Sequence, residues 1–313
     1  MLNWGVIGCG HIANTFADGL GCLDSGKLIA CASNDMSRAS TWAESHKEQH
    51  QIEHIYDSYT ALVMNPDVQA VYVANTHNFH YESVKLCLQH HKHVLCEKPI
   101  TLNAQQAAEL YSLAKTNNCF LMEAVWTRFL PAIRMLQKQL SDNIIGDVLS
   151  LRADFSIDRI LDERHRLRNK ALAGGALLDL GIYPVTFSFI VFGEAPDKIQ
   201  SSAVMDSTDV DQRSFYLFDY SDGRRASLSS GYSHCAPCEA VIAGSAGYIR
   251  VPEFLAAKEF TVHIEGQEPQ THRFPFGPSE NFSFEIQHMQ DCIQQGLEQS
   301  PILPHDESIK VMQ

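Results

Sequence analysis

The chain lacks an excess of positive charge. It has 24 lysines and arginines against 37 aspartates and glutamates, which gives a formal net charge of −13 over 313 residues. Proteins that bind nucleic acid or an anionic membrane use clustered positive charge to neutralise phosphates. We therefore expect neither nucleic acid nor a membrane as a partner of this chain.

Long apolar runs and a cleavable leader are also missing. No stretch approaches the roughly twenty consecutive apolar residues that a membrane-spanning helix needs. The N-terminus enters a predicted strand at once, without the basic segment and apolar core of a signal peptide. The nine cysteines are an odd number and lie scattered along the chain, which is typical of reduced thiols. Together these features predict a cytoplasmic protein.

The first 122 residues alternate strand-like and helix-like patterns. Apolar side chains recur at helical spacing in four segments, and short apolar stretches lie between these segments. Repeated units of this kind predict an α/β domain with a parallel, doubly wound sheet of the Rossmann type. The expected strands are residues 2–7, 27–32, 55–56, 70–74, 93–96 and 119–122, and the expected helices are residues 13–20, 36–47, 79–89 and 103–114.

After residue 122 the pattern changes to segments in which apolar and polar residues alternate. Turn signals such as Asp222-Gly223 separate these segments, which predict a large, mainly antiparallel open sheet. Helices are expected at residues 130–140 and 181–192, and a late helix stops at Gly296. The chain then ends in what we interpret as the start of a further helix. We predict two domains, a dinucleotide-binding domain at 1–122 and an α+β substrate domain at 123–313.

The first predicted strand runs into the sequence GCGHIA, which has the form G-x-G-x-x-A. Gly8 permits a sharp turn, Gly10 lets the backbone approach a pyrophosphate, and Ala13 permits tight packing of the helix on the strand. The N–H groups that open the helix, at His11 and Ile12, are expected to face the phosphates. A glycine-rich turn of an unrelated α/β protein is the alternative, and the strand–turn–helix order argues against it.

The end of the second predicted strand bears on the choice between NAD and NADP. An acidic residue about twenty positions after the glycine turn normally binds the ribose 2′-hydroxyl of NAD. This chain has Ser33 there, so the carboxylate that would repel a 2′-phosphate is missing. Arg38, in the first turn of the next helix, offers a positive partner for that phosphate. We therefore predict NADP as the cofactor, while Asp35 leaves NAD open.

The segment VLCEKP, residues 94–99, ends an apolar run in three chemically distinctive residues. Lys98 follows the carboxyl end of a predicted strand, the edge at which doubly wound sheets bind ligands. Pro99 restricts Lys98 to extended backbone and permits a cis peptide bond before the ring. Together with the glycine turn, this position predicts a catalytic or substrate-orienting lysine. A surface lysine at a strand end is the alternative.

A second cluster lies in GGALLDLGIYP, residues 174–184. Asp179 and Tyr183 are four residues apart and share a face if this stretch is helical. A phenol ordinarily has a pKa of about 10, and a neighbouring ammonium such as that of Lys98 lowers it. We predict that Tyr183 exchanges the substrate proton and that Asp179 orients Lys98 or accepts a hydrogen bond from a substrate hydroxyl. A core tyrosine is the alternative.

Four segments, in the order VIGCGHIA, ANTHNFHYESV, HVLCEKP and GGALLDLGIYP, resemble the Gfo/Idh/MocA oxidoreductases. The segment MEAVWTRFLP resembles the branch of dimeric dihydrodiol dehydrogenases and NADP-dependent D-xylose dehydrogenases. The resemblance implies a nucleotide domain followed by a substrate domain whose open sheet forms a homodimer. It also implies Lys98 as the catalytic lysine and Tyr183 as the proton donor or acceptor.

The resemblance also assigns residues around the cofactor. Thr76, Asn78 and His80 are expected on the cofactor-side loop, and Glu97 is expected beside the nicotinamide ribose. The chain departs from the family pattern at Asn34, where NADP-using relatives often have arginine. It departs again at position 77, where a histidine replaces the proline of many relatives.

The expected activity is transfer of a hydride between nicotinamide and a carbinol or carbonyl carbon of a sugar or cyclic diol. By the same resemblance, Trp126, Arg128 and Phe155 are expected to line the substrate pocket. The two aromatic rings suit a pocket that accepts a ring face. Two alternatives remain open on this scaffold, an NAD-dependent glycosidase and a non-catalytic regulator that senses dinucleotides.

One further group of residues has a spacing that is typical of zinc sites. It consists of His234, Cys235 and Cys238. A closed zinc site needs four ligands, and no second paired motif lies nearby. We therefore expect no metal and interpret these residues as small core side chains in a strand.

Overall fold

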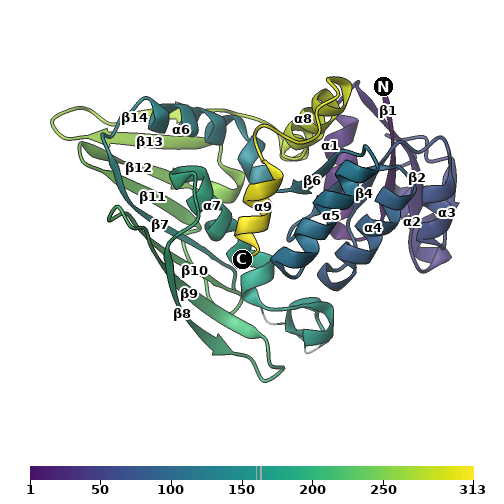
Figure 1. Cartoon of the computed structure of the whole chain (residues 1–313), viewed down its shortest axis with the longest axis horizontal. Helices are drawn as coiled ribbons and strands as arrows, with labels where there is room; N and C mark the ends of the chain where they lie inside the picture. Colours follow the sequence, from purple (N-terminus) through teal and green to yellow (C-terminus); the bar gives the residue numbers. More distant parts are fainter. Residues whose placement is uncertain (160, 163) are drawn as a thin grey trace. The chain divides into compact units, whose positions relative to one another are not determined.

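The computed structural model describes residues 1–159, 161–162 and 164–313, which form two compact units. The first unit contains residues 1–126 and 277–313, and the second contains residues 127–276. The predicted division after residue 122 is wrong for the end of the chain. Residues 277–313 belong to the first unit, where α8 (Ser283–Gln294) packs on α1 (His11–Gly21) and α9 (His305–Val311) packs on α5 (Ala104–Thr116). Figure 1 shows α8 in yellow beside the purple α1.

The first unit is built on a six-stranded sheet in the order β3-β2-β1-β4-β5-β6, and every neighbouring pair is parallel. This order confirms the predicted doubly wound, Rossmann-type sheet, whose order reverses between β1 and β4. The helix α3 (Tyr59–Met64), whose N-cap is Ser58, was not predicted. The strands are β1 (Leu2–Ile7), β2 (Gly26–Ala32), β3 (His54–Tyr56), β4 (Ala70–Val73), β5 (His93–Glu97) and β6 (Leu121–Ala124), and the other helices are α2 (Met36–Ser45) and α4 (His80–Gln89).

Both faces of this sheet are covered, which explains why its central strands are apolar without alternation. On one face, Val71 and Val94 pack with side chains of α4 and α5 such as Val84 and Leu110. On the other face, the ring of Phe16 from α1 stacks on Tyr72 at 4.0 Å between centroids. The sheet therefore presents its strand ends to ligands.

The second unit is an eight-stranded sheet in the order β14-β13-β12-β11-β7-β10-β9-β8, which can be followed from β14 to β8 in Figure 1. Its neighbours are antiparallel except for β7 and β10, which run parallel. The prediction of a mainly antiparallel sheet is confirmed. The strands are β7 (Val148–Ser156), β8 (Lys198–Met205), β9 (Asp211–Asp219), β10 (Arg225–Gly231), β11 (Glu239–Gly244), β12 (Gly247–Pro252), β13 (Glu259–Ile264) and β14 (Gln270–Arg273).

Two helices, α6 (Pro131–Ser141) and α7 (Ile182–Phe192), pack on this second sheet. The run Lys170–Phe192 is long and apolar enough to cross a membrane by length and composition, contrary to the expectation that no stretch approaches a span. However, 72% of its most apolar window is buried inside the structure. Phe187 of α7, for example, packs edge to face on Phe254 at 4.9 Å. The burial is typical of a core helix.

Two local details complete the fold. The stretch Leu177–Gly181, for which the sequence left helical structure open, is a π-helical turn that leads into α7. The helix expected at the end of the chain is present as α9, which begins earlier than expected, at His305, and ends at Val311 with Met312 as its C-cap.

Candidate functional site

The glycine turn joins β1 to α1 and is packed on one side only. Gly8 has φ +95°, and a Cβ on it would lie 2.6 Å from the backbone N of Asn75, just past β4. The Gly8 N–H donates to Ala32 O at 2.9 Å, which ties the turn to β2. A Cβ on Gly10 would meet no atom of the described residues within 4 Å. The turn is therefore packed against the end of β4 at Gly8 and open at Gly10. A backbone that is to bind a pyrophosphate needs this combination.

The start of α1 supports the same interpretation. Gly10 is the N-cap of this helix, in extended backbone, and has no side chain that could cap the first N–H groups. His11 is exposed, Ile12 is half-buried, and Ala13 is buried against the sheet. The first turn therefore suits anion binding, since its N–H groups and the helix dipole both favour negative charge.

At the end of β2 the structure separates the residues predicted to bind the ribose. Ser33 is buried, and its hydroxyl accepts a hydrogen bond from the Asp35 N–H at 3.4 Å. The Asp35 carboxylate caps α2 by accepting from the Arg38 N–H at 3.1 Å. Asn34 and Arg38 are exposed. The exposed amide and guanidinium are therefore better placed for a 2′-substituent than the buried Ser33 hydroxyl.

Lys98 follows β5 directly, in a backbone segment that is fixed on both sides. The Lys98–Pro99 peptide bond is cis, as the sequence permitted. The carbonyl of Pro99 is 2.8 Å from Nδ1 of His80, and the next N–H, that of Ile100, donates to Glu123 Oε1 at 3.0 Å. The side chain of Lys98 is 9% exposed. Glu123, on β6, was missed because nothing near it in the sequence marks it as a partner of Ile100.

The loop after β4 differs from expectation in the role of His80. This side chain is fully buried, and its Nε2 lies 3.0 Å from the carbonyl of Asn75. His80 thus links the loop to the Pro99 segment, and its burial favours a positioning role over direct cofactor contact. Thr76 and Asn78 are half-buried and joined by a hydrogen bond of 2.8 Å between their side chains. Asn75, which packs against Gly8, is a candidate that the sequence did not indicate.

Glu97 belongs to a buried acidic cluster in the first unit. Its Oε1 accepts a hydrogen bond from the hydroxyl of Tyr72. Glu285, on α8, is fully buried, and neither of its carboxyl oxygens has a hydrogen-bond partner within the described residues. Burial, together with the negative charge of Glu97, raises the pKa of Glu285 well above its usual range. Burial and Glu97 likewise raise the pKa of Tyr72. These surroundings therefore favour the protonated forms of Tyr72 and Glu285.

In the second unit, two of the predicted site residues meet. Tyr183, at the start of α7, is half-buried, and its ring packs edge to face on Phe155 of β7 at 5.5 Å between centroids. The interplanar angle is 85°. The pairing fixes the direction of the phenol ring, which a proton-transferring group needs.

Asp179 has a partner that the sequence did not reveal. The guanidinium of Arg166 donates to both carboxylate oxygens of Asp179, at 3.0 and 3.1 Å. Asp179 is buried, whereas Arg166 remains partly exposed. Asp179 therefore forms a bidentate ion pair within the second unit, and its expected role, to orient Lys98 or to bind a substrate hydroxyl, stays a prediction. Arg166 was missed because its loop has no recognisable motif.

Asp211 holds the backbone that leads into the Asp179 turn. Its Oδ2 accepts hydrogen bonds from the Leu177 N–H at 2.7 Å and from the Ser214 hydroxyl at 2.6 Å. Gly175 has φ +116°, and a Cβ on it would lie 2.2 Å from Asp211 Oδ1. Burial raises the pKa of Asp211, against these hydrogen bonds. Asp211 is thus a second positioning residue that sequence reasoning missed.

The predicted substrate residues Trp126 and Arg128 lie on opposite sides of the division between the units. Trp126 is buried in the first unit, where its ring packs on Phe282 at 5.5 Å. Arg128 is buried in the second unit. Phe282, just before α8, was not predicted as a neighbour of Trp126.

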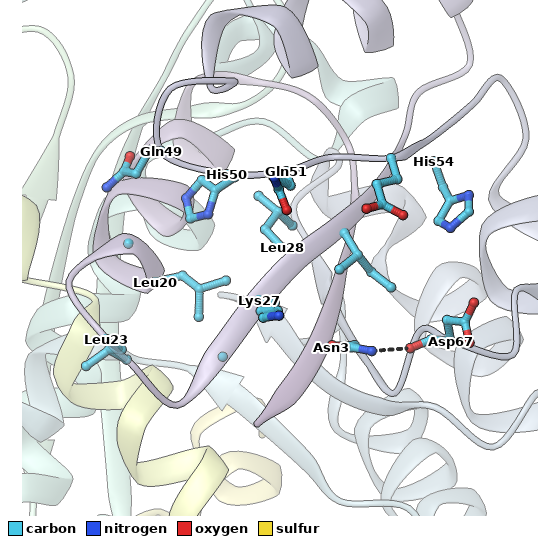
Figure 2. Close-up of a pocket in the computed structure, with 14 residues that line it drawn as sticks. Asn3, Leu20, Leu23, Lys27, Leu28, Gln49, His50, Gln51, His54 and Asp67 are labelled. Carbon is cyan, nitrogen blue, oxygen red and sulfur yellow. Dashed lines mark hydrogen bonds between the residues drawn. The ribbon is translucent and has the colours of Figure 1, made fainter.

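A cleft of about 440 Å³ lies in the first unit, at the amino ends of the parallel strands. Figure 2 shows residues that line it. Asn3 of β1, Lys27 of β2 and His54 of β3 line it. The Asn3 amide donates to the carbonyl of Asp67 at 3.1 Å. The glycine turn follows the carboxyl end of β1, so this cleft lies at the wrong edge of the sheet to be the dinucleotide site.

The residues with zinc-like spacing are not in a strand. Residues 235–238 form a loop between β10 and β11, and Cys235 is exposed. The interpretation as core side chains of a strand is therefore wrong. Within the described ranges, no three or more His, Cys, Asp or Glu side chains are grouped so that they could hold a metal ion.

Comparison with known families matches both parts of the chain. Residues 2–125 match the family described as "Oxidoreductase family, NAD-binding Rossmann fold". Residues 133–250 match the "GFO/IDH/MocA C-terminal domain".

Individual relatives cover nearly the whole chain. A trans-1,2-dihydrobenzene-1,2-diol dehydrogenase from Xenopus tropicalis is 35% identical over 309 residues, which cover 96% of this chain and 92% of that protein. The Homo sapiens protein of the same name is 33% identical, with 98% of this chain and 92% of that protein covered. The solved structure of KijD10, a 3-ketoreductase from Actinomadura kijaniata in complex with NADP and TDP-benzene, has a TM-score of 0.88 at 25% identity and covers 99% of this chain and 94% of that chain.

Proposed function

Because the chain belongs to the Gfo/Idh/MocA oxidoreductase family, we propose a cofactor preference and residue roles for its reaction. The chain is an NAD(P)-dependent oxidoreductase that acts on CH–OH or carbonyl groups of small sugars or diols. Within that activity, the proposal is a preference for NADP, with Lys98 and Tyr183 as catalytic residues. The observation that carries dinucleotide binding is the one-sided cradle at Gly8 and Gly10, followed at the same strand edge by the anchored Lys98.

The preference for NADP rests on the end of β2. The exposed Arg38 guanidinium offers a positive charge for a 2′-phosphate, and the exposed Asn34 offers an amide donor. Asp35, the acid that left NAD open, already caps α2 with its carboxylate. KijD10 is similar in fold and is bound to NADP in its structure. The test is a fluorescence titration with NADPH and NADH in which Arg38→Ala weakens NADPH binding and leaves NADH binding unchanged.

The proton chemistry is assigned to two side chains. When bound, the nicotinamide supplies the carbon that accepts or gives the hydride. Tyr183 Oη takes or returns the substrate hydroxyl proton, and Phe155 holds the phenol ring in one direction. Lys98, which follows the carboxyl end of β5, is the second side chain and supplies a positive charge. Asp179, paired with Arg166, acts as a positioning residue for the turn that leads into Tyr183.

A substrate panel tests the proposed activity. Aldoses, polyols and dihydrodiols are assayed with NADP⁺ and NAD⁺ by absorbance at about 340 nm, the band of the reduced nicotinamide. Net formation of NADPH from a sugar or a cyclic diol is the expected result. Cleavage of a glycoside without net change in NADPH would instead favour the glycosidase alternative, and cofactor binding without turnover would favour a regulator.

We propose in addition that the chain forms a homodimer through the open face of the second sheet. Every residue of the edge strand β8 is exposed, and on β9 the side chains of Phe215 and Leu217 are 49% and 50% exposed. An apolar, exposed sheet face of this kind suits a second copy of the same surface related by a two-fold axis. Light scattering coupled to gel filtration is expected to give twice the chain mass.

A further inference from the structure

A second ion pair in the second unit joins the segment before Asp179 to the turn between β8 and β9. The guanidinium of Arg168 donates to both oxygens of the Asp206 carboxylate, at 2.8 and 2.9 Å. Arg168 ends the 3₁₀-helical turn Arg166–Arg168, and Asp206 directly follows β8. The side chains of Arg168 and Asp206 are 18% and 4% exposed, so water screens the attraction between them only weakly.

The Asp206 carboxylate has further hydrogen-bond donors around it. It accepts from the hydroxyl of Tyr232 at 3.0 Å and from the N–H of Thr208 at 3.2 Å. The hydrogen bonds from Arg168 hold the pKa of Asp206 well below its usual range, so the carboxylate is charged at neutral pH. Loss of one partner would leave the other charge uncompensated, so the pair holds its two segments firmly together.

Leu167 extends this constraint into the core of the second unit. It is the neighbour of Arg168 and lies in a small buried apolar cluster with Ala176, Leu180 and Tyr232. The Leu167 carbonyl accepts a hydrogen bond from the Gly175 N–H at 2.8 Å. Phe155, whose ring packs on Tyr183, contacts the same cluster. The ion pair is therefore connected by packing to the phenol proposed for proton transfer.

Arg166 lies two residues before Arg168 and belongs to the same 3₁₀-helical turn. It forms the bidentate ion pair with Asp179. Asp179 lies in the π-helical turn Leu177–Gly181, which leads into α7 and Tyr183. A shift of the 3₁₀-helical turn would therefore displace the Asp179 carboxylate and the backbone that leads into Tyr183.

We propose that Arg168 and Asp206 are positioning residues for the proton transfer and act through Arg166 and Asp179. The inference rests on the proposed function, in which Tyr183 exchanges the substrate proton. The Arg168–Asp206 pair fixes the 3₁₀-helical turn, and this turn holds the Arg166 guanidinium on Asp179. Such support matters because a misplacement of about 1 Å can lower a rate by on the order of 100-fold.

The first experiment removes the charge of Asp206 and measures turnover of a substrate from the panel of sugars and diols. Asp206→Asn keeps the shape of the side chain and breaks the ion pair, so we expect kcat to fall about tenfold. The Kd for NADPH should be unchanged, since the proposed cofactor site lies in the first unit. The matched control is Asp209→Asn in the same turn, because Asp209 pairs with Lys170 where both side chains are exposed. This control should have the kcat of the wild type.

A double-mutant cycle distinguishes positioning through Asp179 from a general loss of structure. Asp206→Asn is combined with Asp179→Asn, and kcat is compared with that of each single variant. If Asp206 acts through Asp179, adding Asp206→Asn should lower kcat less than about twofold further. A further loss of about tenfold would overturn the proposal, since the two residues would then act independently.

Hydrogen exchange of the full chain, measured by mass spectrometry, needs no substrate. Peptides from residues 166–183 should exchange faster in Asp206→Asn than in Asp209→Asn. If Asp206→Asn fails to fold, Arg168→Lys replaces it, because lysine keeps the charge and loses the two-pronged contact. The same changes are then expected at smaller size.

The outcomes separate this inference from the proposed function. A wild type that turns over no member of the panel would contradict the proposed function, and this inference with it. An active wild type whose kcat and hydrogen exchange are unchanged by Asp206→Asn or Arg168→Lys would overturn this inference alone.

Discussion

The two sheets of this protein differ in how much of each face is buried. In the first unit, β4 and β6 are buried along their whole length, and helices or loops cover both faces. In the second unit, β9 alternates between buried and exposed residues, and β8 is exposed throughout. A sheet covered on both faces offers ligands only its strand ends, whereas a half-covered sheet offers a whole face. The difference is consistent with the two proposals made above, a dinucleotide at the strand ends of the first unit and a second copy on the open face of the second sheet.

The polar residues of the candidate sites follow the same division. In the first unit, buried groups such as Glu97 and His80 are held by hydrogen bonds to Tyr72 and to backbone carbonyls at the strand ends. In the second unit, the corresponding contact is an ion pair between the partly exposed Arg166 and the buried Asp179. The positions of Glu97 and His80 therefore depend on packing of the core, whereas the position of Asp179 depends on attraction between opposite charges.

The largest expected effect concerns Lys98. Lys98→Met keeps the length of the side chain and removes its charge, so the cation proposed for catalysis is lost. We expect kcat to fall about 10³-fold while the Kd for NADPH changes little. The matched control is Lys115→Met, since Lys115 is exposed and lies on α5. An unchanged kcat in Lys98→Met would show that the lysine is not catalytic.

The two glycines of the turn should respond differently to the same substitution. Gly8→Ala places a Cβ 2.6 Å from a backbone nitrogen at positive φ, and we expect the free energy of unfolding to fall by about 2–3 kcal/mol. Gly10→Ala has room for the Cβ, so stability should change little. Its methyl group instead occupies the cradle and should weaken NADPH binding. Urea denaturation and fluorescence titration distinguish the two outcomes, and equal loss of stability would contradict the one-sided packing.

The buried carboxyl group of Glu285 should make the free energy of unfolding depend on pH. Its pKa is raised in the folded state, so the folded protein holds a proton that the unfolded chain releases above the ordinary pKa of a glutamate. This contribution to stability is complete at low pH and is lost as pH rises toward the folded pKa. Glu285→Gln should therefore be more stable than the wild type at pH 8, by on the order of 2 kcal/mol, and nearly equal to it at about pH 4.

The control for this prediction is Glu268→Gln, an exposed position in the second unit. Thermal unfolding across the pH range should show the same curve for the control and the wild type. A parallel shift of the Glu285→Gln curve at every pH would mean that the carboxyl does not carry the pH dependence.

The smallest effect on the single chain is expected at the open face of the second sheet. Leu217→Lys places a charge on an exposed position, so the stability of the monomer should change by less than about 0.5 kcal/mol. The proposed dimer should nevertheless dissociate, because the charge would be buried in it. Light scattering measures the mass. A variant that keeps the mass of the wild type would indicate that this face is not the interface.

Local patterns explain which parts of the fold were predictable. The turn at Gly8 and Gly10 and the position of Lys98 depend on short segments, whose strand–turn–helix order is visible in the sequence. By contrast, the amphipathic pattern of α8 shows that one face is buried but not against which unit. The final helices were therefore assigned to the wrong unit, and Glu285 was missed with them.

Contacts between residues far apart in the sequence of the second unit could not be predicted either. The Asp179 position was predicted from its spacing to Tyr183, yet Arg166 lies in a loop with no periodic pattern. The parallel pairing of β7 with β10 also depends on contacts between distant segments. Such pairings are fixed by packing of the whole sheet and not by any one stretch of sequence.

The central claim is that the first unit binds the dinucleotide while a phenol of the second unit transfers the proton. The most direct test is Tyr183→Phe, with kcat and the Kd for NADPH measured on the same preparation. The account predicts a loss of at least about 100-fold in kcat with a nearly unchanged Kd. Equal losses in both quantities would contradict it and would make Tyr183 a structural residue.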